Sequence, residues 1–208
     1  MLPALLLAAF GVWFVAWGIA PSYREDWLLE NLLVLLAVPA LVWGHSRLRF
    51  SNGAYVCLFV FFCLHEVGAH YTYSEVPYRE WIPALDVSAR NHYDRLVHFA
   101  YGLLVTPALF EVFGAYAPAR AAWRWLLPAT SMFGHSVIYE GVEWAAAEIF
   151  GGDLGAAYLG MQGDEWDAQK DMALAALGSM LSLCALAARE ALTRRRARRP
   201  ASRRSSRS

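Results

Sequence analysis

The stretch GAYVCLFVFFCLHEVGAHYTYSEVPY, residues 53–78, decides the fold class of this chain. Its first twelve residues are uncharged and mostly aliphatic or aromatic, and the first His or acidic side chains are those of His65 and Glu66. The apolar residues are continuous instead of recurring every third or fourth position, as they would in a soluble amphipathic helix. About 20 such residues cross a bilayer as a helix. The stretch therefore predicts a membrane-spanning helix with ionisable groups in its last turns.

The rest of the chain is similarly apolar. Hydrophobic side chains make up 58% of the 208 residues, which is more than in soluble domains. Six runs are long enough to be spans: roughly 2–20, 28–45, 53–71, 95–115, 126–149 and 171–189. No Lys or Arg precedes the first run, so we expect a retained helix instead of a cleaved signal peptide. The sequence predicts an all-α polytopic membrane protein, a bundle of about six transmembrane helices in residues 1–188.

Basic residues predict the orientation of this bundle. Lys and Arg are concentrated after the second, fourth and sixth spans, which places both termini in the cytoplasm of a multi-pass protein of the bacterial inner (plasma) membrane. Residues 189–208 contain nine Arg, and we expect a disordered tail that binds anionic inner-leaflet lipid and no nucleic acid. The preceding 188 residues carry a net charge of −8, which would attract cations to the outer face.

Ionisable residues at helical spacing recur in or beside four of the spans. They are Glu66 and His70, Asp94 and His98, Glu140 and Glu143, and Asp164, Asp167 and Asp171. Such residues are costly in hydrocarbon, and alternating span directions bring all four groups to the outer half of the bilayer. The sequence thus predicts one shared polar pocket on the extracytoplasmic side. We expect the loop 72–94 and the Gly-rich segment 151–163 to cover its mouth.

Two arrangements would make such a pocket tolerable. In the first, carboxylates and histidines from several helices hold one or two divalent metal ions, and Zn, Mn and Fe all suit this ligand set. The predicted ligands are His65, Glu66, His70, Asp94, His98 and Asp171, and the candidate catalytic acids and bases are Glu140, Glu143, Asp164 and Asp167. In the second arrangement, the acids pair with Arg90, Arg95, Lys170 and the histidines, although acids outnumber these bases. Glu25 and Asp26 are interpreted as ordinary loop charges, and His135 as a packing residue.

Four stretches through these residues resemble the YjdF-like inner-membrane proteins of bacteria, a family grouped as a domain of unknown function. The stretches are HEVGAHYTYSEVPY, RNHYDRLVHFAYG, YEGVEW and GMQGDEWDAQKDM. This resemblance implies a multi-span membrane protein with no established biochemical role. A more distant similarity is to VanZ-like proteins, whose pattern resembles Asp94, Arg95, His98 and Phe99. The chain has Glu143 and Asp171 where that pattern tends to have amides.

Three functions are compatible with these features. The leading hypothesis is a metal-dependent enzyme acting on a lipid or lipid-linked headgroup at the outer leaflet, with one carboxylate as general acid or base. The second is a non-enzymatic, VanZ-like protein that protects the envelope by binding a cationic or headgroup ligand. The third is a small cation or proton-coupled carrier with Glu111 as a relay. The carrier is disfavoured because the inner halves of the spans offer no continuous polar path.

Overall fold

The computed structural model describes residues 1–85, 89–150 and 161–197. This part of the chain contains helices and turns and no strand. Its elements are α1 (Leu2–Trp17), α2 (Arg24–Gly44), α3 (Asn52–His70), the short α4 (Tyr78–Trp81), the 3-10 turn η1 (Pro83–Leu85), α5 (Tyr93–Tyr116), α6 (Trp123–Phe150) and α8 (Asp167–Ala197). The all-α prediction is confirmed. Residues 86–88 and 151–160 of the two predicted covering segments lie outside the described residues, as do residues 198–208 of the predicted tail.

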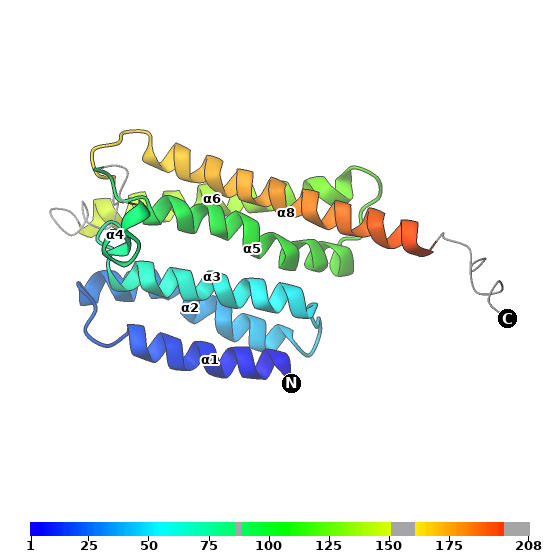
Figure 1. Ribbon diagram of the computed structural model, residues 1–208, viewed down its shortest axis with the longest axis horizontal. Coiled ribbons are helices and arrows are strands. Elements are labelled where there is room, and N and C mark those ends of the chain that lie inside the picture. The colour runs from blue at the N-terminus through cyan, green and yellow to red at the C-terminus, as the bar shows by residue number, and fades with distance from the viewer. Residues whose placement is uncertain (86–88, 151–160, 198–208) are drawn as a thin grey trace.

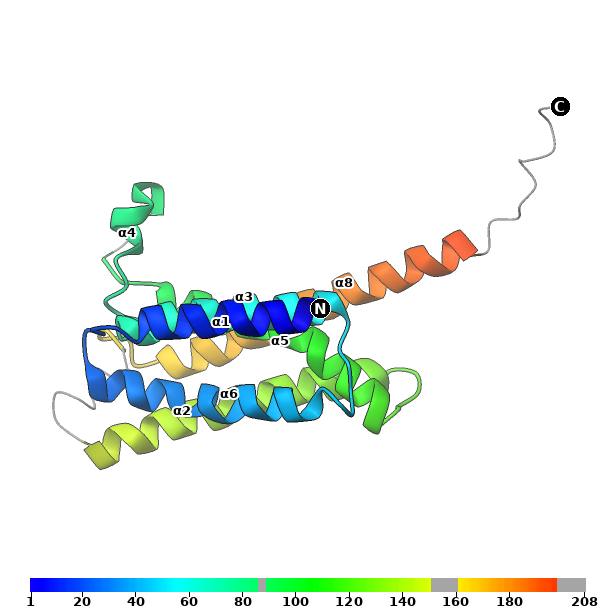
Figure 2. The ribbon, with the colours of Figure 1, turned by 90° about the horizontal axis from the view of Figure 1, so that it is seen from below.

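The long helices run along a common axis in two layers. One layer contains α1, α3, α5 and α8, and α2 and α6 form the second (Figure 1, Figure 2). The closest packing is between α5 and α8, and α5 also packs against α3 and α6. The N-terminus and the last residues of α8 lie at the end of the bundle opposite α4 (Figure 1). We refer to the two ends as the α4 end and the terminal end.

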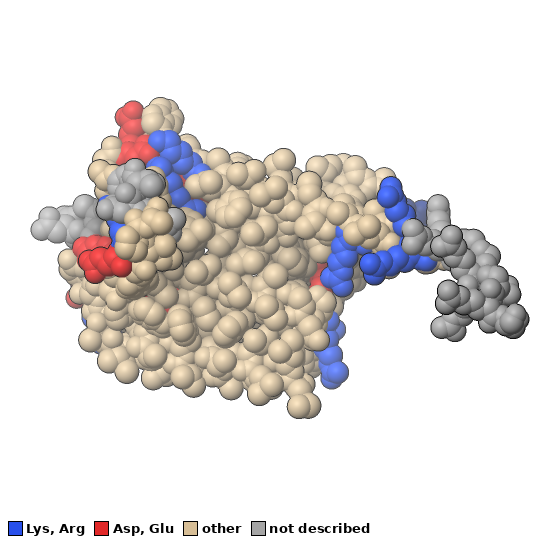
Figure 3. All heavy atoms as spheres, viewed as in Figure 1, with Lys and Arg blue, Asp and Glu red and all other residues tan. Residues whose placement is uncertain are grey.

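The surface of this bundle fits a membrane environment. Four described helices, α2, α3, α5 and α8, are long and apolar enough to cross a membrane. The apolar α1 is shorter, with 16 residues, and α6 has 28 residues but carries several acids in its second half. On the face shown in Figure 3, a broad band without Lys, Arg, Asp or Glu separates the charged groups at the two ends. The structure thus supports a polytopic membrane protein, and the number of six spans stays a prediction.

Small residues allow α5 and α8 to approach each other closely. A Cβ atom added to Gly102 would lie 1.8 Å from the carbonyl oxygen of Ala175, and one added to Gly178 would lie 2.2 Å from a carbonyl oxygen of α5. One turn beyond Gly102, the Thr106 hydroxyl donates to Ser179 Oγ over 2.8 Å. Small residues and hydroxyl hydrogen bonds of this kind drive helix association in lipid. The contact fixes the position of α8 against α5.

Both boundaries of α8 differ from the sequence-based expectation. The helix starts at Asp167, before the expected span of 171–189, so it includes Asp167 and Asp171 but not Asp164. Asp164 Oδ1 instead accepts from the backbone N–H of Trp166 over 3.2 Å, a local turn bond that competes with helix formation. At the other end the helix continues to Ala197, so residues 189–197 are helical where a disordered tail was expected. Their Ala, Leu and Arg residues favour helix, and the basic side chains complement the negative helix end.

Candidate metal centre at His98

His98 lies between two carboxylates near the α4 end of the bundle. It is on the second turn of α5, and its Nε2 is 3.4 Å from Asp94 Oδ1, one turn earlier on the same helix. Its Nδ1 is 3.6 Å from Oε1 of Glu140 on α6. The histidine is only 6% exposed. Each ring nitrogen therefore faces a different acid inside the bundle.

Two further acids complete this group, which we call the His98 cluster: Asp94, His98, Glu140, Glu143 and Asp171. One ligand-type atom from each of Asp94, His98 and Asp171 lies within 4.8 Å of the other two, and the same holds for His98, Glu140 and Glu143. Asp171 comes from the second turn of α8, two helical turns before Gly178 of the close contact with α5. Three helices thus bring five groups of metal-ligand type together.

Two buried oxygens of the His98 cluster have no hydrogen-bond partner among the residues that the structure describes. They are Oδ1 of Asp171 and Oε1 of Glu140. Asp171 is only 2% exposed, so solvent does not supply the hydrogen bond that its Oδ1 atom lacks. A buried charge without a partner is strongly unfavourable. The cluster therefore requires bound protons or a bound cation.

Nearby basic residues do not neutralise the cluster, because they pair with other acids. Arg95 donates to Asp164 Oδ2 over 2.5 Å and to Asp167 Oδ1 over 2.9 Å, and Arg90 also pairs with Asp167. Lys170 donates to Asp164 over 2.5 Å. Hydrogen bonds from Lys170 and Arg95 lower the pKa of Asp164 well below its usual range. We call these residues the ion-paired rim, and Asp164 and Asp167 belong to it, not to the His98 cluster.

The three predicted ligands on α3 do not join the His98 cluster. His65 Nδ1 lies 2.5 Å from the hydroxyl of Tyr73, whose pKa is raised by burial. His70 Nδ1 donates to the carbonyl oxygen of Trp17 over 2.7 Å. Glu66 is completely buried, and within the described ranges neither of its carboxylate oxygens has a hydrogen-bond partner. The three predicted ligands on α3 therefore lie in different local environments.

Sequence reasoning missed a group of polar residues on α2. Asp26, interpreted as a loop charge, lies in the first turn of α2 because the helix starts at Arg24, earlier than expected, and it is 1% exposed. Glu30 is 4% exposed, and Oε2 of its side chain accepts from the Tyr139 hydroxyl of α6 over 3.0 Å. Glu30 and Asn31 interrupt the apolar run LLENLLVLL. That interruption was the available signal, since ionisable groups inside apolar spans are unusual.

A cavity of about 950 Å³ extends from the His98 cluster along the inside of the bundle. It is lined by α2, α3, α5 and α6, with Asp94, His98 and His65 in its wall at the polar end. Most of the remaining wall is apolar, and it reaches Arg47 and Tyr116 at the terminal end. Asp94 and His98 of the cluster thus lie at the polar end of a long apolar cavity.

Comparison with known proteins supports the membrane assignment. The family described as "Predicted membrane protein (DUF2238)" matches residues 2–191. The inner membrane protein YjdF of Escherichia coli (strain K12) is 33% identical to this chain over 177 residues, which cover 82% of this chain and 81% of that protein. No solved structure matches. The predicted resemblance to YjdF-like proteins is confirmed, and the chain belongs to the DUF2238 family of membrane proteins.

Proposed function

We propose that the His98 cluster binds a divalent metal and that the protein is a membrane enzyme acting on the headgroup of a lipid or lipid-linked molecule. One observation carries this proposal. Four acids and a histidine converge from three helices, and two of the buried acid oxygens lack a hydrogen-bond partner among the described side chains. A metal cation satisfies such oxygens and offsets their charge. The oxygen and imidazole ligand set suits Zn, Mn or Fe.

The two nitrogens of His98 suggest two alternative metal positions. A metal on the Nε2 side would be held by Asp94, His98 and Asp171, with Glu140 accepting the remaining N–H. A metal on the Nδ1 side would be held by His98, Glu140 and Glu143, with Asp94 accepting instead. Metal-binding histidines usually donate their other N–H to a carboxylate, so both positions fit the observed distances.

The same arrangement supports hydrolytic chemistry. A divalent metal makes a bound water more acidic and polarises a phosphoryl or carbonyl oxygen. A carboxylate outside the metal shell would take up the water proton as general base. If the metal lies on the Nε2 side of His98, Glu143 would be left for this role; on the Nδ1 side it would be Asp171, because Asp94 would then accept the N–H of His98. Asp164 and Asp167 are less suited to it because the ion-paired rim holds both of them as charged partners.

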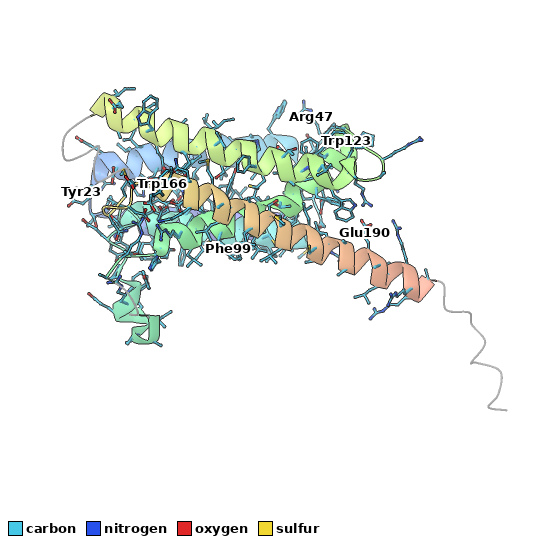
Figure 4. All side chains as sticks on the ribbon, turned by 90° about the horizontal axis from the view of Figure 1, so that it is seen from above. Tyr23, Arg47, Phe99, Trp123, Trp166 and Glu190 are labelled. Atoms are coloured by element: carbon cyan, nitrogen blue, oxygen red, sulfur yellow. The ribbon has the colours of Figure 1, made fainter. Side chains whose placement is uncertain are left out.

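Charge distribution supports an extracytoplasmic position for this site. The end of α8 that carries Arg194, Arg195 and Arg196 lies opposite the α4 end (Figure 4). Basic residues are retained on the cytoplasmic side of membranes. With that end in the cytoplasm, the His98 cluster lies in the outer half of the bilayer, and its ligand is an outer-leaflet headgroup.

The two alternative functions receive less support. Glu111, the relay residue of the carrier hypothesis, accepts a hydrogen bond from the backbone N–H of Ser51 over 2.8 Å, beside the start of α3. It therefore has a structural partner at the terminal end. A VanZ-like binding protein would use the same cluster without turnover. If it binds its ligand without metal, the metal content of the purified protein distinguishes it from the proposed enzyme.

Metal analysis of the purified protein tests the proposal. Protein reconstituted with Zn, Mn or Fe should retain one or two ions per chain after dialysis, and His98→Ala should lose them. His70→Ala and the distant His45→Ala are matched controls that should keep the metal, since His70 bonds to Trp17 and His45 to Tyr55. Circular dichroism verifies that each variant stays helical. A metal-free wild-type protein would overturn the proposal.

A further inference from the structure

The apolar cavity beside the His98 cluster has the shape and position of a site for a hydrocarbon chain. Its polar end contains His98 and His65, and the Nε2 atom of His65 has no hydrogen-bond partner among the described residues. His65 is 6% exposed, so this atom is a buried donor or acceptor in the cavity wall. A ligand with a polar head and an apolar chain would satisfy both parts of the wall.

The length of the cavity also fits such a ligand. Along α5 the wall extends from His98 to Tyr116, a rise of about 27 Å at the helical 1.5 Å per residue. Figure 4 shows Arg47, which lines the far end, at the opposite end of the bundle from Trp166. The hydrocarbon core of a bilayer is about 30 Å thick. A long chain whose head is at His98 would therefore be extended through most of the membrane's depth.

The cavity has an open side toward the surrounding lipid. Its walls include α2 and α6, which do not pack closely against each other along their lengths, although Tyr139 of α6 bonds to Glu30 of α2 near the cluster. Two of the lining residues, Leu36 on α2 and Ile138 on α6, are 63% and 65% exposed. Apolar side chains exposed in this way contact lipid when the protein is in a membrane. A chain from the bilayer would enter between α2 and α6.

We propose that this cavity binds one hydrocarbon chain of the substrate lipid, which enters between α2 and α6 while its headgroup is held at the His98 cluster. The inference rests on the proposed function and specifies its substrate class. The substrate is a single-chain acyl or isoprenyl lipid, or a lipid of which one chain enters the cavity while the others stay in the bilayer. It also explains the apolar wall, since a soluble headgroup alone would leave most of the cavity unused.

Photoreactive lipids test this inference in protein reconstituted into vesicles. One probe carries a diazirine on a palmitoyl chain of phosphatidylglycerol, and the other carries it on a polyprenyl phosphate. Mass spectrometry should locate the adducts on the cavity wall, including residues near Val105 and Ala37. Ala37→Phe and Val105→Phe fill the cavity and should reduce this labelling to background. Ala185→Phe, on the exposed face of α8 and outside the wall, should leave it unchanged.

The two probes identify the chain, and metal content separates the two proposals. Stronger cavity labelling by one probe supports the inference and assigns the substrate as acyl or isoprenyl. Labelling that is spread over the outer surfaces of α1 and α8, and is insensitive to Ala37→Phe, overturns it even if the protein binds metal. If the wild type is metal-free but Ala37→Phe abolishes cavity labelling, the chain site stands and the metal proposal fails.

Discussion

The His98 cluster and the end of α3 contain the same sequence pattern but have different surroundings. Asp94 and His98 are an acid and a histidine four residues apart, and so are Glu66 and His70. The first pair meets three more acids from α6 and α8, whereas His70 bonds to the carbonyl oxygen of Trp17 at the end of α1. Helical spacing places an acid and a histidine on one face, but the helices opposite that face decide whether they form a site.

The positions of the two helices explain this difference. α5 is central and packs against α3, α6 and α8, so residues on several of its faces meet other helices. α3 packs against α1, α2 and α5; the end of α1 supplies Trp17, and the turn after α3 itself supplies Tyr73. The polar groups at the end of α3 are therefore satisfied locally, except for Glu66 and one nitrogen of His65.

The largest loss of metal binding and stability is expected when α5 and α8 are forced apart. Gly102→Ala would place a Cβ 1.8 Å from a backbone oxygen of α8, so the helices must move apart and carry Asp171 away from His98. Overpacking of this kind costs about 1–3 kcal/mol, and more where backbone must shift. We expect metal loss and a lower unfolding temperature. Gly114→Ala on the same helix meets nothing within 4 Å and serves as control. Equal behaviour of the two variants would refute the role of this contact.

Removing single acids should locate the metal within the cluster. If the metal lies on the Nε2 side of His98, Asp171→Asn removes a ligand, and Glu140→Gln only weakens the orientation of the ring, by about 10–100-fold in metal affinity. On the Nδ1 side the order is reversed. Glu66→Gln on α3 should leave affinity unchanged. Isothermal titration with Zn or Mn measures all three, and a larger loss for Glu66→Gln would contradict the distinction between the two regions.

Removing the Tyr73 hydroxyl should affect stability without affecting the metal. Tyr73→Phe leaves the Nδ1 atom of buried His65 without its partner, and an unsatisfied buried polar group costs about 1–3 kcal/mol. Thermal unfolding in detergent should show the loss, and metal content should match the wild type. Tyr71→Phe, on a half-buried side chain of the same segment, provides the control. Metal loss in Tyr73→Phe would place the end of α3 inside the functional site.

The smallest effect is expected at the ion-paired rim. Asp164 has a folded-state pKa below its ordinary value of 3.8, so its contribution to stability is present above that pH and is lost as the pH falls toward the folded value. The unfolding temperature of Asp164→Asn should therefore be slightly lower than that of the wild type near neutrality. This difference should shrink only as the pH falls below about 4. Glu165→Gln, in the same turn but outside the rim, is the control. A gap that widens in acid would contradict the assigned ion pairs.

Sequence reasoning predicted the helical class, and local pattern supplied the acid and histidine pairs of the candidate site. Asp94 with His98, and Glu140 with Glu143, are one turn apart, and such pairs can be found without a structure. Their meeting with Asp171 depends on the small residues between α5 and α8, whose register no local pattern reveals. Asp164 and Asp167 were predicted as catalytic residues, and their pairing with Arg90, Arg95 and Lys170 was kept as an alternative, because sequence spacing does not show which acid meets which base.

The unexpected length of α8 has a consequence for experiments on the intact protein. Its 31 residues extend about 46 Å, which exceeds the roughly 30 Å of bilayer hydrocarbon. With Asp171 held inside the bundle, the excess must emerge at the terminal end as a stiff stalk (Figure 1). A fluorophore attached at Ala197 would stand clear of the other helices, and its distance from the bilayer would report the tilt of α8.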